Sequence, residues 1–351
     1  MIILLLFFIT WLEQVPQPAP GPVVKSEFLF ENAPFASVHA STIAEAGNEL
    51  VAAWFGGSRE GARDVGIWLT RHVKGEWQTP IEVATGVQPD GTRYPCWNPV
   101  LFQMPDGTLT LFYKVGPSPQ RWWGMVRRSP DHGRTWTDVE RLPDGILGPI
   151  KNKPVRLSGD LVIASSSTES PERPSAWRVH FERTEDGGGT WTTAFAPGAA
   201  DGPQVDAIQP SILIHPGRRR QALGRTRSGR VFESRSSDDG RTWTPLALTA
   251  LPNPNSGIDA LTLKDGRHLV VYNHTTAWRT PLNLSLSHDG RIWEAALVLE
   301  HEPGEYSYPA AIQTADGLVH ITYTWRRQRI KHVVLDPGKL KSTPMRDGVW
   351  P

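Results

Sequence analysis

The chain has 351 residues, and its 37 lysines and arginines nearly balance its 36 aspartates and glutamates, which gives a formal net charge of +1. So small a net charge gives no reason to expect nucleic acid or a membrane as the partner. The single cysteine, Cys96, excludes an internal disulfide. No metal-site or cofactor motif is found in the sequence, so we predict no metal and no cofactor.

The chain begins with an apolar run from Met1 to Leu12, followed by a proline-rich stretch up to Pro22. The run is too short for a membrane span and has the length of the hydrophobic part of a signal peptide. We therefore predict a signal-like or disordered segment over residues 1–24 and no membrane span after processing. The predicted location is secreted or periplasmic, with a cytoplasmic location as the alternative.

Residues 25–351 are predicted to form a single domain, because one repeat fills them. Six polar turns with a central glycine separate apolar, β-rich runs. Their spacing of roughly 50 to 60 residues leaves room for about four short strands per copy, which is typical of propeller blades. The glycines are Gly47, Gly107, Gly159, Gly217, Gly266 and Gly317. The predicted fold class is therefore all-β, a six-bladed β-propeller.

A second motif, Ser/Thr-x-Asp-x-Gly-x-x-Trp, occurs at residues 129–136, 184–191 and 236–243, with a copy one residue shorter at 287–293. In a tight hairpin the aspartate accepts backbone N–H bonds, the glycine takes a positive φ, and the tryptophan packs under neighbouring strands. We interpret each copy as a structural staple of its blade. It should lie on the face opposite to the starts of the inner strands.

The repeat also predicts which residues meet at the other face. Residues about eight positions before and after each turn glycine lie on antiparallel strands, so they share one end of the ring. In all six repeats these positions include polar or ionisable residues, and basic residues outnumber acidic ones. On a chain with almost no net charge, this excess predicts a pocket for an anionic ligand, such as a carboxylate held by guanidinium groups.

The repeated octets match the Asp-box, or bacterial neuraminidase repeat, and the chain resembles a divergent subgroup of the sialidase-like superfamily over roughly residues 35–335. Sialidases hold the carboxylate of sialic acid with three arginines and use a tyrosine as nucleophile. The resemblance implies that Arg225 and Arg279 are two of these arginines. It places the tyrosine in Glu305–Pro309, where the distance to the turn favours Tyr308 and the Tyr-Ser order favours Tyr306.

Three positions depart from the sialidase pattern. His39 stands near the position of the first arginine, and Gln209 replaces the glutamate that assists the tyrosine. The acid/base aspartate has no direct counterpart, and the nearest carboxylic acids are Glu60 and Asp64. The predicted catalytic residues are Glu60, Tyr308, Tyr306, Asp64 and His39, and the predicted substrate-binding residues are Arg59, Arg225, Arg279, Asn98, Lys114, Lys151, Gln209 and Asp259.

These residues predict an exo-acting glycoside hydrolase that removes a terminal acidic sugar, sialic acid or a related one, from a glycan. Glu60 is the predicted acid, and His39, Asp259 or Glu305 is expected to polarise the tyrosine. One alternative is cleavage of uronate-containing polysaccharide by hydrolysis or by β-elimination. Another is a glycan-binding propeller without catalysis. The run Trp325–Arg329 is interpreted as a charged edge that prevents edge-to-edge pairing of the closing strand.

Overall fold

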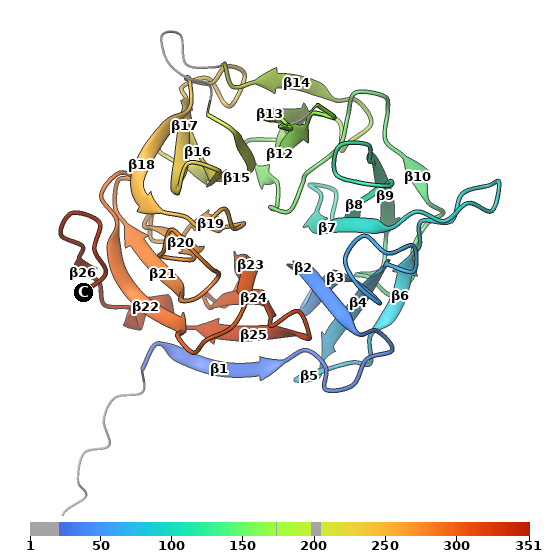
Figure 1. Ribbon diagram of the computed structural model, residues 1–351, viewed down its shortest axis with the longest axis horizontal. Coiled ribbons are helices and arrows are strands. Elements are labelled where there is room, and N and C mark those ends of the chain that lie inside the picture. Colours follow the sequence, from blue (N-terminus) through green and yellow to red (C-terminus); the bar gives the residue numbers. More distant parts are fainter. Residues whose placement is uncertain (1–20, 173, 198–204) are drawn as a thin grey trace, which may run out of the picture.

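The structure is a computed structural model, and it describes residues 21–172, 174–197 and 205–351. Its strands form six antiparallel sheets in a ring around a central axis, which confirms the predicted six-bladed β-propeller (Figure 1). Most of the predicted signal-like segment, residues 1–20, lies outside the described residues. Among the residues that are described, no helix has both the length and the hydropathy that a membrane crossing requires.

We number the sheets as blades 1 to 6 in the chain order of their inner strands. Blade 1 contains β2 (Ser37–Ala46), β3 (Glu49–Gly57), β4 (Gly66–Val73), β5 (Glu76–Trp77) and β6 (Ile81–Ala84). Blade 2 contains β7 (Cys96–Gln103), β8 (Leu109–Val115), β9 (Trp123–Ser129) and β10 (Glu140–Arg141). Blade 3 contains β11 (Val155–Arg156), β12 (Val162–Glu169), β13 (Trp177–Thr184) and β14 (Thr192–Phe195).

Blade 4 contains β15 (Ala207–Ile214), β16 (Arg220–Thr226), β17 (Arg230–Ser236) and β18 (Ala247–Pro252). Blade 5 contains β19 (Asp259–Thr262), β20 (His268–Tyr272), β21 (Leu282–Ser287), β22 (Glu294–Glu300) and β26 (Thr343–Pro344). Blade 6 contains β23 (Tyr306–Gln313), β24 (Val319–Trp325), β25 (Arg329–Leu335) and β1 (Val23–Phe28). A short 3-10 helix, η1 (Pro337–Lys339), follows blade 6.

The six predicted turn glycines join the first and second strands of the six blades. All six have a positive φ, from 62° at Gly47 to 89° at Gly317, a backbone conformation that glycine adopts without steric penalty. Apolar side chains fill the spaces between neighbouring blades: one cluster joins Val51 of blade 1 to Leu111 of blade 2, and another joins Leu269 of blade 5 to Ile321 of blade 6. The core is therefore divided among the blade interfaces.

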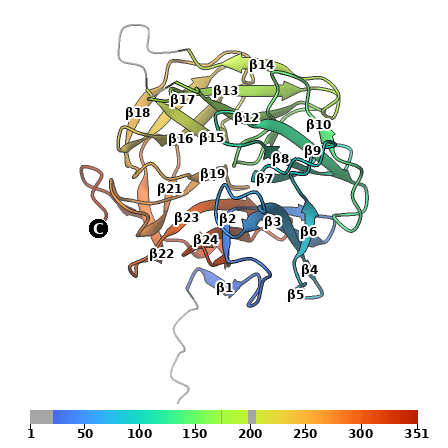
Figure 2. The ribbon, with the colours of Figure 1, turned by 45° about the vertical axis from the view of Figure 1, so that its right-hand side comes forward.

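The ring is closed by β1, which pairs with β25 in blade 6. Both views place β1 at the outer rim (Figure 1 and Figure 2). The interpretation of Trp325–Arg329 as a protected edge is wrong, because β25 lies between β24 and β1 and so has no open edge. Strand β1 begins at Val23, two residues before the predicted start of the domain at residue 25. Blade 6 thus combines both ends of the propeller.

Four inner strands carry a β-bulge near their start. The register shifts in β2, β7, β15 and β23 coincide with positive φ angles at Ala40, Asn98, Gln209 and Tyr308. A bulge re-aims the side chains next to it, and a left-handed conformation costs a non-glycine residue about 1 kcal/mol or more. The same distortion therefore recurs at the end of the ring where the predicted site residues lie.

The Asp-boxes form the predicted staples. In the copy at 236–243, the Asp238 carboxylate accepts hydrogen bonds from the Ser236 hydroxyl and from both the backbone N–H and the hydroxyl of Thr242, at 2.6 to 2.9 Å. The Trp243 indole donates to the Gly240 carbonyl and packs against Phe181 of blade 3, with ring centroids 3.7 Å apart. Each staple is thus made by local bonds and one contact with the neighbouring blade.

Candidate active site

Tyr308 lies at the centre of the predicted site. It sits on the bulge of β23, and its side chain is buried, with 8% exposed. Its Oη accepts hydrogen bonds from Arg225 Nη1 at 2.6 Å and from Gln209 Nε2 at 3.4 Å. The His39 ring packs against it, with ring centroids 4.0 Å apart. Blades 1, 4 and 6 therefore meet at this tyrosine.

Cationic groups from three blades surround the Tyr308 ring. The charged ends of Arg279, Arg225 and Lys151 lie 5.6, 5.7 and 5.9 Å from its centroid. Arg225 is fixed in place because its guanidinium also donates to Asn255 Oδ1 at 2.8 and 3.0 Å and to Gln209 Oε1 at 3.2 Å. The positive charge expected from the sequence is therefore gathered around one aromatic side chain.

A further arginine, Arg327, belongs to this group and was not predicted. Glu305 bridges Arg279 Nη1 at 2.8 Å and Arg327 Nε at 2.7 Å, and Arg327 Nη1 donates to Glu60 at 2.6 Å. Arg327 stands ten residues after the turn glycine of blade 6, as Arg227 does in blade 4. Comparison of the repeats at this offset would have found it. We call Tyr308, His39, Arg225, Arg279, Arg327 and Glu305 the Tyr308 cluster.

Exposure increases across the cluster from its centre to its edge. Arg225 is 7% exposed, the side chains of Arg279 and Arg327 are 24% and 27% exposed, and that of Glu60 is 43% exposed. The most solvent-accessible side of the cluster is therefore that of Glu60 and Arg327. The carboxylate of Glu305 is held by both arginines, and although burial raises its pKa, those two positive charges bring the pKa below its ordinary value.

His39 is buried within the cluster, and its Nδ1 lies 2.9 Å from the Thr324 hydroxyl. Burial lowers the pKa of His39 well below its ordinary value, and the positive charges of Arg327, Arg279, Arg225 and Lys151 lower it further. The ring is therefore neutral near pH 7. A neutral imidazole beside Tyr308 has one nitrogen able to accept a proton.

Lys151 borders the Tyr308 ring, but its ammonium group is hydrogen-bonded to other parts of the propeller. It is 2% exposed, and its ammonium donates to the Asn152 side chain and to the carbonyls of Ile258 and Pro309. It thus links blades 3, 5 and 6. Burial lowers its pKa to about 7.

Two predicted substrate contacts are placed away from solvent. Lys114 has no exposed surface, and its Nζ donates to the Pro149 carbonyl at 2.9 Å. Asp259 is 1% exposed and accepts bonds from Lys153, from the Ser211 hydroxyl and from the Ala311 backbone N–H. Lys114 therefore lies in the interface between blades 2 and 3, and the Asp259 carboxylate has partners from blades 3, 4 and 6. Asn98, on the bulge of β7, is also buried at 5% exposed.

The other predicted residues lie beside the cluster. Asp64 accepts bonds from the backbone N–H and the hydroxyl of Ser58, at 2.8 and 2.9 Å; burial raises its pKa, but these bonds produce a net lowering. It therefore closes the loop that carries Glu60 and the exposed Arg59. Tyr306 is 1% exposed, and its Oη accepts bonds from Arg326 at 3.2 and 3.3 Å. Of the two candidate tyrosines, Tyr308 is the one in contact with Arg225.

The ring of six antiparallel blades has the fold of solved sialidase structures. The chain belongs to the family described as BNR repeat-like domain, whose model matches residues 48–321. Among curated proteins no match is found.

Solved structures share the fold at low sequence identity. A protein of unknown function from Dyadobacter fermentans is 21% identical, with a TM-score of 0.72, over 90% of this chain and 99% of that chain. The Hadza microbial sialidase Hz136 is 16% identical, with a TM-score of 0.71, over 87% of this chain and 66% of that chain. The intramolecular trans-sialidase from Ruminococcus gnavus, in complex with oseltamivir carboxylate, is 13% identical, with a TM-score of 0.70, over 93% and 100%. The TM-scores show a common fold.

Proposed function

We propose that the protein is an exo-acting glycosidase that removes a terminal acidic sugar from a glycan. The observation that carries the proposal is Tyr308, whose hydroxyl lies 2.6 Å from Arg225 in a cluster with Arg279 and Arg327. The arginines suit a sugar carboxylate, because guanidinium groups bind carboxylates through paired hydrogen bonds. The binding of oseltamivir carboxylate by the Ruminococcus gnavus enzyme, which has the same fold, supports this ligand class.

In the proposed reaction, Tyr308 Oη attacks the anomeric carbon while the bond to the leaving oxygen breaks. A neutral nucleophile suits a substrate that already carries a carboxylate, because it avoids repulsion between two negative charges. Glu60 donates a proton to the leaving oxygen and then removes one from the water that releases the sugar. Its position at the more exposed edge of the cluster suits contact with the leaving group.

The proton of Tyr308 needs an acceptor, and His39 is the best placed. Gln209 has no basic atom, Asp259 is buried against Lys153, and Glu305 is held by two arginines. Besides burial, the pKa of His39 is lowered by Arg327, Arg279 and Arg225, the arginines proposed to bind the substrate, and by Lys151. A bound carboxylate offsets their charge and so raises the pKa of His39. Substrate binding would thus make His39 a stronger base for the proton of Tyr308.

A second candidate function is β-elimination from a uronate. It is favoured by one observation: among the described residues, the hydrogen-bond partners of Tyr308 Oη are Arg225 and Gln209, with no carboxylate. His39 or Tyr308 would remove the proton next to the carboxylate, the bond from the ring to the leaving oxygen would break, and a carbon–carbon double bond would form.

The experiment is a screen of 4-methylumbelliferyl glycosides of sialic, ketodeoxynonulosonic and glucuronic acids, together with uronate-containing polysaccharides. Release of the fluorophore by the wild type, lost in Arg225→Ala and kept in Arg241→Ala, is the expected result. Arg241 is an exposed Asp-box arginine and serves as the control. Ultraviolet absorbance from an unsaturated product, without fluorophore release, would favour elimination. Glycan binding without any turnover would overturn both reactions.

A further inference from the structure

A second concentration of positive charge lies between blades 4 and 5. It surrounds a cavity of about 520 Å³ beside the Asp-boxes at 236–243 and 287–293. Four arginines line the cavity, Arg219, Arg220, Arg235 and Arg291, while Asp289 is the single acidic residue in its wall. None of the lining residues belongs to the Tyr308 cluster, so this site is separate.

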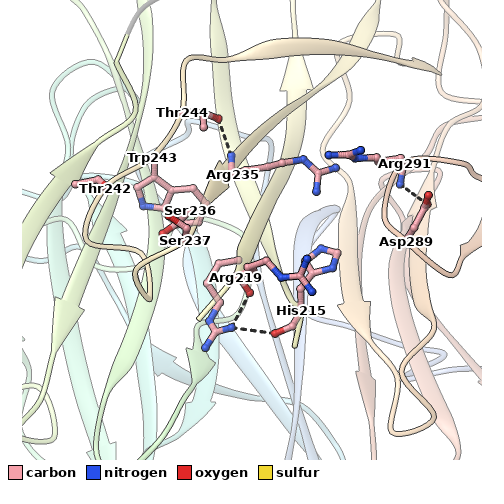
Figure 3. A pocket seen from close by; sticks show the side chains of 11 residues that line it. His215, Arg219, Arg235, Ser236, Ser237, Thr242, Trp243, Thr244, Asp289 and Arg291 are labelled. Atoms are coloured by element: carbon pink, nitrogen blue, oxygen red, sulfur yellow. Dashed lines mark hydrogen bonds between the residues drawn. The ribbon is translucent and has the colours of Figure 1, made fainter. Parts of the chain in front are cut away.

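The arginine side chains converge in the cavity. Figure 3 shows Arg235 and Arg291 reaching toward one another from neighbouring blades, with the Arg219 side chain directed to the same space beside His215. The pKa of His215 agrees with this arrangement. Burial lowers it, a bond with Gln221 raises it, and the positive charges of Arg235, Arg219 and Arg220 lower it again. An excess of positive charge on one wall attracts an anion.

The protein neutralises only part of this charge. Arg220 pairs with Asp239, and Arg235 pairs with Glu233 at 2.8 Å. The Arg219 side chain donates only to the Pro216 carbonyl, at 3.2 Å, and the part of the chain that the structure describes holds no side-chain partner for Arg291. The Asp289 carboxylate accepts bonds from the Ser287 hydroxyl and from backbone N–H groups of its own turn. Two guanidinium groups are therefore left without a carboxylate.

The junction between blades 1 and 2 shows how the same geometry is neutralised elsewhere in this chain. There, Glu49 pairs with Arg71 of its own blade and, at 3.1 Å, with Arg134 of the next Asp-box. Glu49 stands two residues after the turn glycine Gly47, and its carboxylate lies between the two arginines.

Each of these three positions has an equivalent between blades 4 and 5. Arg219 stands two residues after Gly217, as Glu49 does after Gly47. Arg235 pairs across its hairpin with Gln221, just as Arg71 pairs with Val51, and Arg291 is the arginine of the next Asp-box. The two flanking arginines are thus retained, and the carboxylate between them is replaced by a third arginine.

We propose that this cavity binds a tetrahedral oxyanion, a sulfate or phosphate group carried on a glycan, in the place that Glu49 occupies between blades 1 and 2. Such a group has several terminal oxygens, which can accept bonds from Arg219, Arg235 and Arg291 together. It supplies the negative charge that the junction lacks. The oxyanion site itself does not depend on the proposed reaction at Tyr308, whereas its assignment to a glycan rests on the proposed function. It would hold an acidic glycan at a distance from the Tyr308 cluster.

The test measures binding by calorimetry in an Arg225→Ala background, which weakens anion binding at the Tyr308 cluster. The ligands are a sulfated oligosaccharide, its desulfated form, inorganic sulfate and inorganic phosphate, with chloride at matched ionic strength. We expect the sulfated sugar to bind and the desulfated sugar not to bind. Binding of the inorganic ions as tight as that of the sulfated sugar would overturn the assignment of a glycan ligand.

The variants make the assignment specific. Arg219→Glu restores the carboxylate found between blades 1 and 2, so it should abolish binding and raise the melting temperature of the ligand-free protein. Arg291→Ala should weaken binding about 10- to 100-fold, because it removes charge-assisted hydrogen bonds. Arg134→Ala is the matched control and should bind like the parent. Should Arg219→Glu fail to fold, Arg219→Gln replaces it; unchanged affinity in either variant would overturn the proposal.

Discussion

The Asp-boxes at one end of the propeller and the Tyr308 cluster at the other differ in how far apart in the sequence their bonded polar groups lie. In the Asp-boxes, each carboxylate is satisfied within its own turn: Asp238 and Thr242 are four residues apart. In the Tyr308 cluster, Arg225 and Tyr308 are 83 residues apart, and Arg327 and Glu60 are 267 residues apart. The first kind of contact forms wherever the local motif occurs. The second exists only after the ring has closed.

This difference predicts a separation of effects. Changes in an Asp-box should lower the stability of a blade and leave the chemistry at the other end intact. Changes in the Tyr308 cluster should alter turnover and binding while most of the core, which lies between the blades, stays as it is. Substitutions at each end, compared by the same two measurements, test whether the division holds.

The largest expected effect is that of Tyr308→Phe. Loss of the hydroxyl removes the proposed nucleophile, so kcat should fall by about 10³-fold or more. The free energy of unfolding should change by only about 1 to 2 kcal/mol, because the hydrogen bonds from Arg225 and Gln209 to the hydroxyl are lost while Arg225 keeps Asn255 and Gln209 as partners. Kinetics on the substrate found in the screen and urea unfolding measure the two quantities. Near-normal turnover would exclude Tyr308 as the nucleophile.

The next effect is that of Arg279→Ala on substrate binding. Arg279 lies over the Tyr308 ring and pairs with Glu305, and in the proposal it binds the sugar carboxylate. We expect KM for an acidic glycoside to rise about 10- to 100-fold, because a charge-assisted hydrogen bond to the sugar carboxylate is lost. The control is Arg241→Ala, at the opposite end of the molecule. An unchanged KM in Arg279→Ala would show that this arginine does not hold the carboxylate.

The turns and Asp-boxes, which are formed by residues close in the sequence, are well predicted from it. The contacts of the Tyr308 cluster, between residues far apart in the sequence, are predicted only in part. Gly47 and its five counterparts reveal the blades because a glycine turn and a staple are read from adjacent residues. The bulges at Gln209 and Tyr308 leave no such signal, yet they decide which side chains face the axis. A count from the turn also carries no information on burial, and it includes Lys114 and Asp259, whose side chains are buried and have partners within the propeller.

Arg327 is a site residue that the sequence alone did not predict. In the sequence it stands in a run of charged residues, which favours the interpretation of an exposed edge. Its position in the site depends on β1 covering β25 and on the loop of Glu60 arriving from blade 1. Both contacts join residues that are far apart in the chain. The arrangement becomes visible only when the ring is complete.

Acid should weaken the closure on which the Tyr308 cluster depends. At the closure His320 Nδ1 lies 3.0 Å from His332 Nε2, and His332 Nδ1 lies 3.1 Å from Glu27 of β1. Burial, and then the charge of His332, lowers the pKa of His320 from 6.5 to about 4. In this interval the unfolded chain binds a proton that the folded chain does not, so the free energy of unfolding should decrease as pH falls from 6.5 to 4.

The contribution of His320 to this loss should be roughly 3 kcal/mol, since one pKa unit corresponds to about 1.4 kcal/mol. Unfolding by urea across the interval, in the wild type and in His320→Gln, measures it, since glutamine does not titrate. At lower pH, Glu27 contributes. Burial raises its pKa, but the bonds from His332 and Lys25 bring it from 4.5 to about 2. A further decrease in the free energy of unfolding is therefore expected as pH falls from 4.5 to 2. Equal pH dependence in both proteins would show that His320 is not the group responsible.

The smallest effect is expected at the Asp-box end, from Asp238→Ala. The substitution removes the acceptor for Ser236 and for two donors of Thr242, all close to the surface, so the free energy of unfolding should fall by about 1 to 2 kcal/mol. Turnover measured well below the melting temperature should equal that of the wild type, because no hydrogen bond among the described residues joins this turn to Tyr308. The matched substitution Asp289→Ala, in the box that lacks the threonine donor, also removes three hydrogen bonds and should have a similar effect. A fall in kcat for Asp238→Ala at full folding would mean that the two ends are coupled through the blade.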